Sequence, residues 1–201
     1  MFTGIVEDMG LVEAVEKKRN LCTFSLYAPK VFKGVKLGDS IAIDGVCLTV
    51  AKIKGKVLSF DMMKETLEKT TLGSLRNGSR VNLERAMMAQ DRFGGHMVTG
   101  HVDGLGKILK VIRDKNYVEF QIAMPSGLRK FIAPKGSICV NGISLTVGAT
   151  RRVARTLCFS VYMIPFTMQV TNMSEKKVGD FVNIEVDILA RYILRQRVKE
   201  L

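Results

Sequence analysis

Apolar and polar residues alternate along two stretches of the chain that resemble each other. The stretch "SIAIDGVCLTV" (40–50) places apolar side chains at alternate positions on both sides of Asp-Gly, and "SICVNGISLTV" (137–147) does so around Asn-Gly. This alternation is typical of β-strands, and both dipeptides favour a type I′ turn, whose central residues need positive φ. Each stretch therefore predicts a β-hairpin.

Further alternating runs predict the remaining strands of the first half. They lie at 4–16, 22–29, 55–62 and 79–86, and the second half has counterparts. One helical pattern covers 64–75, where Gly73 is in place to end the helix. Six short strands and one short helix in each half predict a small closed barrel.

Three sequence blocks recur in the same order, which indicates a tandem duplication. The matching blocks are 1–10 with 97–106, 38–50 with 135–147, and 78–84 with 179–185. The offset is 96, then 97, then 101 residues, a period far too long for a solenoid. The predicted fold class is therefore mainly β, with two tandem six-stranded antiparallel Greek-key barrels and short helices. We expect domains at 1–90 and 97–187.

The pattern changes to helical spacing after Asp187. In "ILARYILRQRVKEL" (188–201) the apolar residues Ile188, Leu189, Tyr192 and Ile193 share one side, which Leu194 can extend, with Arg and Lys elsewhere. The first copy is followed by no such segment, so an added C-terminal helix is predicted. Its apolar stripe packs either on its own barrel or on a partner chain.

Composition narrows the class of protein further. The 201 residues are 47% hydrophobic, which provides cores and argues against disorder. The sequence shows neither a secretory signal nor a membrane span, so we expect a cytoplasmic protein without a membrane partner. The four cysteines lie far apart without a CxxC pair, which argues against a disulfide framework or a thiolate metal site. The net charge of +12 leaves nucleic-acid binding only as a minor alternative, because the basic residues are scattered and Trp is absent.

Six motifs in order carry a resemblance to a known family. They are "MFTGIVE", "GDSIAIDGVCLTV", "FDMMKETLEKTTLG", "GGHMVTGHVDG", "GISLTVG" and "VNIEVD". Over residues 1–187 the chain resembles riboflavin synthase, the single-chain, two-barrel type of the lumazine-protein superfamily. The resemblance implies a cofactor-independent dismutation of two 6,7-dimethyl-8-ribityllumazine molecules by a homotrimer. Association with lumazine synthase is a further expectation, and a non-catalytic lumazine- or flavin-binding protein is the nearest alternative.

The two copies match at groups suited to binding and differ where reactive groups stand. Thr49 of the first copy matches Thr146 of the second. The differing pairs are Cys47 with Ser144 and Ile5 with His101. Two similar sites with unlike reactive residues suit a reaction between two identical molecules, one as donor and one as acceptor.

Candidate catalytic residues follow from these differences. His101 is predicted as a general base or acid, since histidine titrates near neutral pH. Cys47 is predicted as a nucleophile or a site-lining donor, and its alternative role is that of a small buried hydrophobe. Ser144 is predicted as a hydrogen-bond donor. His96, which follows Gly-Gly in the linker, is predicted to be structural, and joint metal binding with His101 is not expected.

The resemblance adds further residues to the site. It implies that Asp187 is a catalytic carboxylate, with a helix N-cap as its alternative role, and that Phe2 lies over the site. Ser40 is a further catalytic candidate. The substrate-binding residues implied in the first copy are Gly4, Ile5, Val6, Cys47, Leu48, Thr49, Asp61, Met62, Met63, Lys64, Glu65 and Thr66. Those in the second copy are Gly100, His101, Val102, Lys135, Ser144, Leu145, Thr146, Tyr162, Met163, Ile164, Pro165, Phe166 and Thr167. The chain departs from the family pattern at Phe166, Asn172 and Met173, where a polar residue, threonine and leucine are usual.

Overall fold

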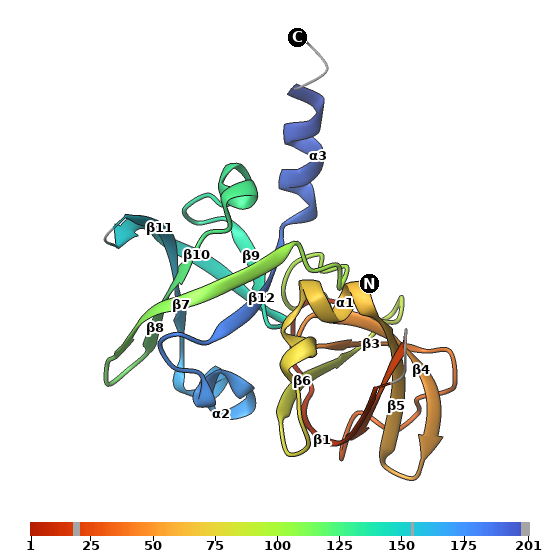
Figure 1. Cartoon of the computed structure of the whole chain (residues 1–201). Coiled ribbons are helices and arrows are strands. Elements are labelled where there is room, and N and C mark those ends of the chain that lie inside the picture. Colours follow the sequence, from red (N-terminus) through yellow and green to blue (C-terminus); the bar gives the residue numbers. More distant parts are fainter. Residues whose placement is uncertain (18–20, 154, 198–201) are drawn as a thin grey trace.

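The structure, a computed structural model, describes residues 1–17, 21–153 and 155–197. Two barrels lie side by side, and a C-terminal helix projects away from both (Figure 1). Each barrel is closed by six antiparallel strands. The mainly β fold of two duplicated barrels, predicted from the alternation and the repeat, is confirmed.

The first barrel has the strand order β1-β2-β5-β4-β3-β6. Its strands are β1 (Asp8–Lys17), β2 (Leu21–Tyr27), β3 (Ser40–Ile43), β4 (Val46–Lys54), β5 (Val57–Met63) and β6 (Arg80–Arg85). Alternate residues of each strand point inward, and Phe24, Phe60 and Leu83 are among those that fill the core.

The second barrel repeats this order around its ring, as β10-β11-β8-β7-β12-β9. Its strands are β7 (Gly104–Arg113), β8 (Val118–Ala123), β9 (Ser137–Val140), β10 (Ile143–Val153), β11 (Thr156–Met163) and β12 (Phe181–Val186). Phe120, Phe159 and Ile184 lie in its core. Its short helices are η2 (Ser126–Phe131), α2 (Pro165–Val170) and η3 (Asn172–Glu175).

Both predicted hairpin turns are present, and they meet where the barrels touch. Asp44 and Gly45 have φ of 46° and 80°, and Asn141 and Gly142 have φ of 47° and 78°, as a type I′ turn requires. A Cβ on Gly45 would lie 2.7 Å from the amide nitrogen of Gly142. The glycines are therefore needed both for the turn and for the approach of the barrels.

Two predicted elements differ from the structure. The helix expected at 64–75 is split into α1 (Lys64–Lys69) and η1 (Thr71–Ser74), because Thr70 is extended and its hydroxyl caps the amide of Leu72. Gly73 ends no helix, since it lies inside η1, where a Cβ would meet the Leu67 carbonyl oxygen. The strand expected from residue 4 begins at Asp8, because Gly4 turns the chain with a φ of 75°.

The C-terminal helix α3 (Ile188–Arg197) is anchored at its first turns. Asp187 Oδ1 accepts a hydrogen bond from the Leu189 amide, and Arg191 Nη2 contacts both carboxylate oxygens of Asp103 at 2.8 and 2.9 Å. Leu189, Tyr192 and Ile193 are all more than half exposed, whereas Ile188 and Leu194 are half-buried, so the chain itself covers only part of the apolar stripe. Residues 198–201 of the predicted helix lie outside the described residues.

A polar network joins the barrels with near two-fold symmetry. Asn82 Nδ2 donates to the Asn141 carbonyl (2.9 Å), and Asn183 Nδ2 donates to the Asp44 carbonyl (2.8 Å). Asn172 breaks the symmetry, since its Nδ2 donates to Asp44 Oδ1 at 2.9 Å. The departure from the family pattern at Asn172 thus has a structural effect at the barrel contact.

Candidate active site

The two Thr-Gly segments are exchanged between the barrels. The carbonyl of Gly4, from the first copy, accepts a hydrogen bond from the amide of Ser144 in the second barrel (2.7 Å). The carbonyl of Gly100, from the second copy, accepts one from the amide of Cys47 in the first barrel (2.9 Å). Likewise Val6 packs against the core of the second barrel and Val102 against that of the first.

This exchange regroups the candidate residues. The first-barrel site combines residues 47–49 of β4 with 100–102, and β5 and the start of α1 (61–66) lie alongside β4. The second-barrel site combines 144–146 of β10 with 4–6, and 162–167 lie alongside β10. Each site is therefore built from both copies, a grouping that alignment of the repeat alone does not reveal.

Two buried carboxylates hold the exchanged segments. Glu84 on β6 accepts hydrogen bonds from the Thr3 amide (2.7 Å), the Thr3 hydroxyl (2.9 Å) and the Gly4 amide (3.0 Å). Glu185 on β12 accepts the same three bonds from Thr99 and Gly100 at 2.7, 2.6 and 2.9 Å. Burial raises the pKa of both carboxyl groups, and these hydrogen bonds lower it in part. The recurrence of Thr-Gly together with Val-Asn-x-Glu is explained by this contact.

Cys47 lies against the segment that carries His101, at Gly100. Cys47 is half-buried on β4, and a Cβ on Gly100 would lie only 2.4 Å from the Cys47 Cβ. His101 follows Gly100 directly and is exposed. A side chain at position 100 would separate the two segments, so glycine is needed there for the contact with Cys47.

Ser144 of the second-barrel site contacts a residue that the sequence analysis assigned to structure alone. Its Oγ lies 2.7 Å from Nδ1 of His96, and the His96 amide donates to the Thr3 carbonyl at 3.1 Å. The signal in the sequence was the preceding Gly-Gly, because a Cβ on Gly95 would lie 2.0 Å from the Thr3 carbonyl oxygen.

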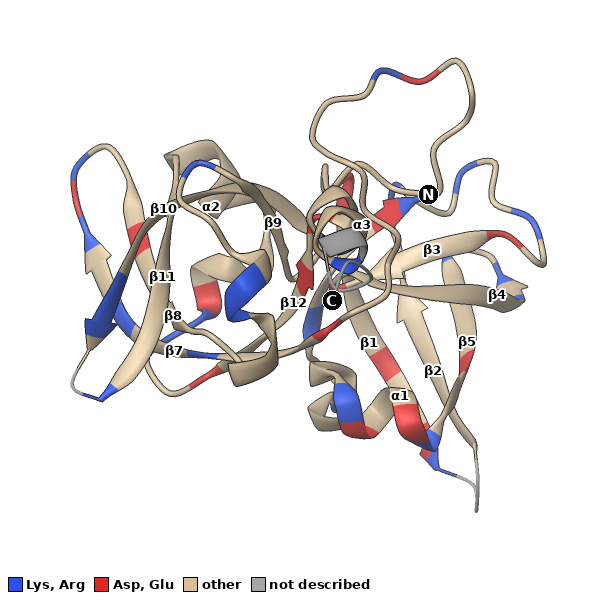
Figure 2. Cartoon of the chain, turned by 90° about the horizontal axis from the view of Figure 1, so that it is seen from above, with Lys and Arg blue, Asp and Glu red and all other residues tan. Residues whose placement is uncertain are grey.

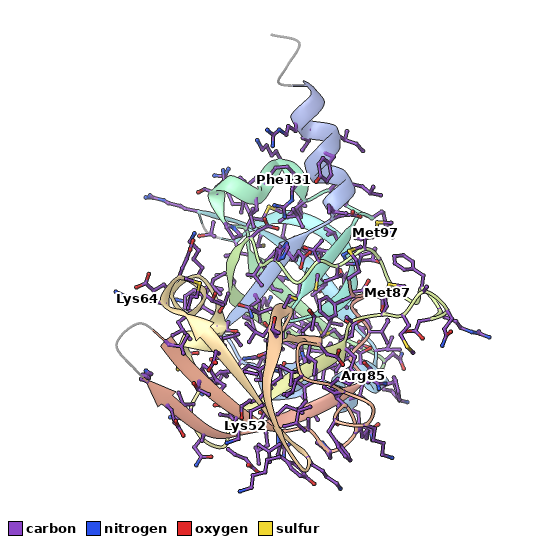
Figure 3. The ribbon with its side chains drawn as sticks, turned by 90° about the vertical axis from the view of Figure 1, so that its right-hand side faces the viewer. Lys52, Lys64, Arg85, Met87, Met97 and Phe131 are labelled. Carbon is purple, nitrogen blue, oxygen red and sulfur yellow. The ribbon has the colours of Figure 1, made fainter. Side chains whose placement is uncertain are left out.

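Figure 3 shows the linker loop projecting between Met87 and Met97, with Met97 nearer to α3.

Comparison with known proteins gives the family. The model of the lumazine binding domain matches twice, at residues 3–86 and 99–187. Riboflavin synthase of Actinobacillus pleuropneumoniae is 44% identical over 193 residues, covering 96% of this chain and 88% of its own. The chain belongs to the riboflavin synthase family. Riboflavin synthase of Bacillus subtilis (strain 168) is 42% identical over 196 residues, covering 97% of this chain and 89% of its own.

Solved structures support the same conclusion for the fold. A crystal structure of LumP complexed with riboflavin superposes with a TM-score of 0.83 at 25% identity, covering 92% of this chain and 99% of that chain. A second LumP structure, complexed with 6,7-dimethyl-8-(1'-D-ribityl) lumazine, gives a TM-score of 0.81 at 25% identity, with the same coverage.

Three residues implied as catalytic by the riboflavin synthase resemblance occupy different surroundings. Phe2 is fully buried between the barrels and pairs with Val98, so its ring packs there instead of lying open over a site. Ser40 is half-buried on β3 opposite Thr49. Asp187 is half-buried and caps α3, as its alternative role required.

Strand alternation divides the predicted binding residues of this riboflavin synthase family member into buried and exposed ones. Leu48, Met62 and Met163 point into the barrel cores and are buried, so they reach a ligand only through their backbone. At the first-barrel site the outward residues include Asp61, Met63 and Glu65, and at the second they are Tyr162, Ile164 and Phe166. The rim of one site is partly charged, whereas that of the other is aromatic and aliphatic.

Lys135 stands where the backbone favours glycine. Its φ is 68°, and the aligned residue of the first copy, Gly38, has a φ of 88°. Both amides bond to the equivalent residue of the neighbouring strand, Val147 for Lys135 and Val50 for Gly38. The exposed lysine is therefore held in the left-handed backbone region, which residues other than glycine adopt less readily.

Two hollows of the surface lie apart from the predicted reactive residues Cys47 and Ser144. One of about 570 Å³ is lined by Val111, Arg113, Lys176, Lys177 and Val178. Another of about 410 Å³ includes Tyr117, Pro165 and Gln169. Neither hollow is lined by Cys47 or Ser144. The candidate site is therefore defined by the exchanged segments, which contact the strands that carry the predicted reactive residues.

Charge and membrane features add little to the site. Lys and Arg occur on both barrels, with Asp and Glu among them (Figure 2). In the part of the chain that the structure describes, no helix has the length and apolar character of a membrane span. Among the same residues, no three His, Cys, Asp or Glu side chains are placed to hold a metal ion.

Proposed function

We propose that this member of the riboflavin synthase family catalyses the dismutation of two 6,7-dimethyl-8-ribityllumazine molecules. A four-carbon unit passes from one molecule to the other, giving riboflavin and 5-amino-6-(D-ribitylamino)uracil. The observation that carries this proposal is the pair of equivalent sites with unlike reactive groups. Cys47 beside Gly100-His101 forms one, and Ser144 beside Gly4-Ile5 forms the other.

The reaction needs a proton removed from a ring methyl group, a nucleophile added to a ring carbon, and a proton returned. His101 is exposed beside Cys47, as a group that moves protons to and from a bound ring must be. Cys47 either adds to a ring carbon as a nucleophile or donates a hydrogen bond to a nitrogen or oxygen of the ring. Ser144 donates a hydrogen bond in the second-barrel site, and the carboxylate of Asp187 supplies negative charge close to it.

Substrate binding uses backbone and hydroxyl groups that recur in both copies. Thr49 and Thr146 are exposed, and Thr66 and Thr167 are half-buried at matching positions. These hydroxyls suit a ribityl chain, which presents several hydroxyl groups of its own. The LumP structures, bound to riboflavin and to the ribityl lumazine, support this class of ligand for the same fold.

The two sites act together only when they face each other, and in our proposal they do so between chains. A homotrimer ring joins the first barrel of one chain to the second barrel of the next. The exposed Leu189, Tyr192 and Ile193 of α3 support an oligomerisation role for this helix. The unpaired state of all four cysteines supports a cytoplasmic location. Association with lumazine synthase is part of the same proposal.

The test is incubation of the purified chain with 6,7-dimethyl-8-ribityllumazine while riboflavin absorbance is followed. We expect riboflavin and the uracil product in equal amounts, without added metal or cofactor. His101→Gln should lower turnover, and Lys52→Gln, an exposed change on the same strand as Cys47, should not. Tight binding of the lumazine without product would instead identify a non-catalytic binding protein.

A further inference from the structure

His96 lies in the linker segment that crosses the second-barrel site. Its ring is 8% exposed, and its Nδ1 lies 2.7 Å from the Ser144 Oγ. The His96 amide donates to the Thr3 carbonyl, and a Cβ on Gly95 would lie 2.8 Å from the Ser144 Cβ, so the segment passes close to Ser144. The position of the ring is thus fixed by the exchanged segment that builds the site.

We propose that His96 is a positioning residue for the Ser144 hydroxyl, an inference that rests on the proposed function. A serine hydroxyl rotates among several orientations unless a partner selects one. The buried contact with His96 selects one orientation, in which the remaining hydrogen-bonding capacity of Oγ is directed to a lumazine bound in the second-barrel site.

The surroundings of the ring support this role. Burial lowers the pKa of His96, and the charge of Asp187 opposes that effect only in part, so the ring is neutral at pH 7. Its Nε2 is buried and bonds to no side chain or backbone group of the described residues. Ser144 is therefore the side chain to which this imidazole is hydrogen-bonded.

The first-barrel site uses its histidine differently. His101 is exposed beside Cys47, whereas His96 is buried behind Ser144. Each site thus has one of the two histidines of the chain. His101 is within reach of solvent and ligand, and His96 acts through the Ser144 hydroxyl. Unlike roles for the two bound lumazines follow from this difference.

The experiment compares His96→Asn with His96→Leu, two changes of almost equal size and shape. Asparagine keeps a polar atom close to the place of Nδ1, and leucine does not. We expect His96→Leu to lower kcat roughly 10- to 100-fold, as loss of a buried hydrogen-bond partner does. His96→Asn should recover most of that loss, with KM little changed in both, and thermal melts show which chains are folded.

A double-mutant cycle isolates the path of the effect. If His96 acts through Ser144, His96→Leu in a Ser144→Ala chain should lower kcat no further than Ser144→Ala alone. Multiplied losses in the double variant would overturn the proposal, as would wild-type kcat in a folded His96→Leu chain. If His96→Leu does not fold, the test rests on His96→Asn. A folded His96→Asn chain whose kcat is as low as that of Ser144→Ala would also overturn the proposal. An inactive wild-type chain would count against the proposed function instead.

Discussion

The amide of Cys47 donates a hydrogen bond of 2.9 Å to the carbonyl oxygen of Gly100, 53 positions further along the chain. This bond ties the reactive cysteine of the first barrel to the segment that carries His101 from the second copy. Gly4 and Ser144 make the equivalent contact, in which the segment of the first copy binds the second barrel. Substitutions can therefore be chosen that damage the residues of one site and leave the other site intact.

This grouping defines a complementation experiment. One chain carries Cys47→Ala and His101→Gln, which disable the first-barrel site, and the other carries Ser144→Ala and Asp187→Asn in the second. If the ring joins unlike barrels of neighbouring chains, random assembly makes about three quarters of the trimers mixed, each with one intact junction of three. About a quarter of wild-type turnover should return in co-expressed protein, measured as riboflavin formed. No recovery from verified mixed trimers would show that each chain forms its own complete site.

The exposed face of α3 should control the oligomeric state. Replacing Leu189, Tyr192 and Ile193 together with glutamine keeps the helix but removes its apolar stripe, so sedimentation should show a smaller species. Arg195→Gln on an exposed position of the same helix is the control and should leave the size unchanged. A trimer that persists in the triple variant would remove α3 from the interface.

Loss of charge at Glu185 should loosen the segment over Cys47. In Glu185→Gln the amide NH₂ meets either the Gly100 amide or the Thr99 donors, so at least one donor loses its acceptor. We expect a loss of about 2 kcal/mol in the free energy of unfolding and faster hydrogen exchange at the Gly100 amide. Glu84→Gln is the matched control, because it should speed exchange at Gly4 and leave Gly100 protected. Equal effects of both variants at Gly100 would contradict separate roles.

Asp44 should make stability depend on pH. Burial raises the pKa of Asp44 to about 6. The folded state therefore holds a proton that the unfolded chain releases near pH 4, and the free energy of unfolding falls as pH rises from about 4 to 6. Asp44→Asn should leave stability unchanged at pH 3.5 and raise it by up to about 3 kcal/mol at pH 8.

The second copy provides a control for this change. Asn141 occupies the place of Asp44, and its Oδ1 already accepts the amide of Asn183 (2.8 Å), as Asp44 Oδ1 accepts that of Asn82 (2.8 Å). Asn141→Asp should therefore destabilise the chain at pH 8 and have little effect at pH 3.5. Denaturant unfolding at both pH values measures the difference, and parallel pH curves for wild type and Asp44→Asn would disprove the assignment.

What the sequence predicts well here is local. The turns at Asp44-Gly45 and Asn141-Gly142 follow from dipeptides whose backbone preference operates over two residues, and the duplication follows from repeated letters. The helix predicted at 64–75 is interrupted at Thr70, next to a hydrogen bond from the Thr71 amide to Asn183 Oδ1 of the second barrel (2.8 Å), a contact that the local pattern does not show.

What the sequence does not predict is contact between the copies. Alignment of the two copies pairs Gly4 with Gly100, because aligned residues are similar in sequence. The alignment does not show that each glycine binds the barrel of the other copy. Phe2 shows the same limit, since nothing local reveals that it meets Val98 between the barrels. His96 was assigned to the linker for the same reason, although its site partner lies 48 residues away.

The exchange of the Thr-Gly segments has a consequence for the origin of the chain. A single copy would present a Gly4 carbonyl without its amide partner and a Cys47 amide without its carbonyl. Two single copies could satisfy each other, Gly4 of each meeting Cys47 of the other, as an isologous pair. The two-barrel chain then corresponds to such a dimer fused through residues 87–97. In a fused chain the two halves can differ, as they do here at Cys47 and Ser144 and at Ile5 and His101.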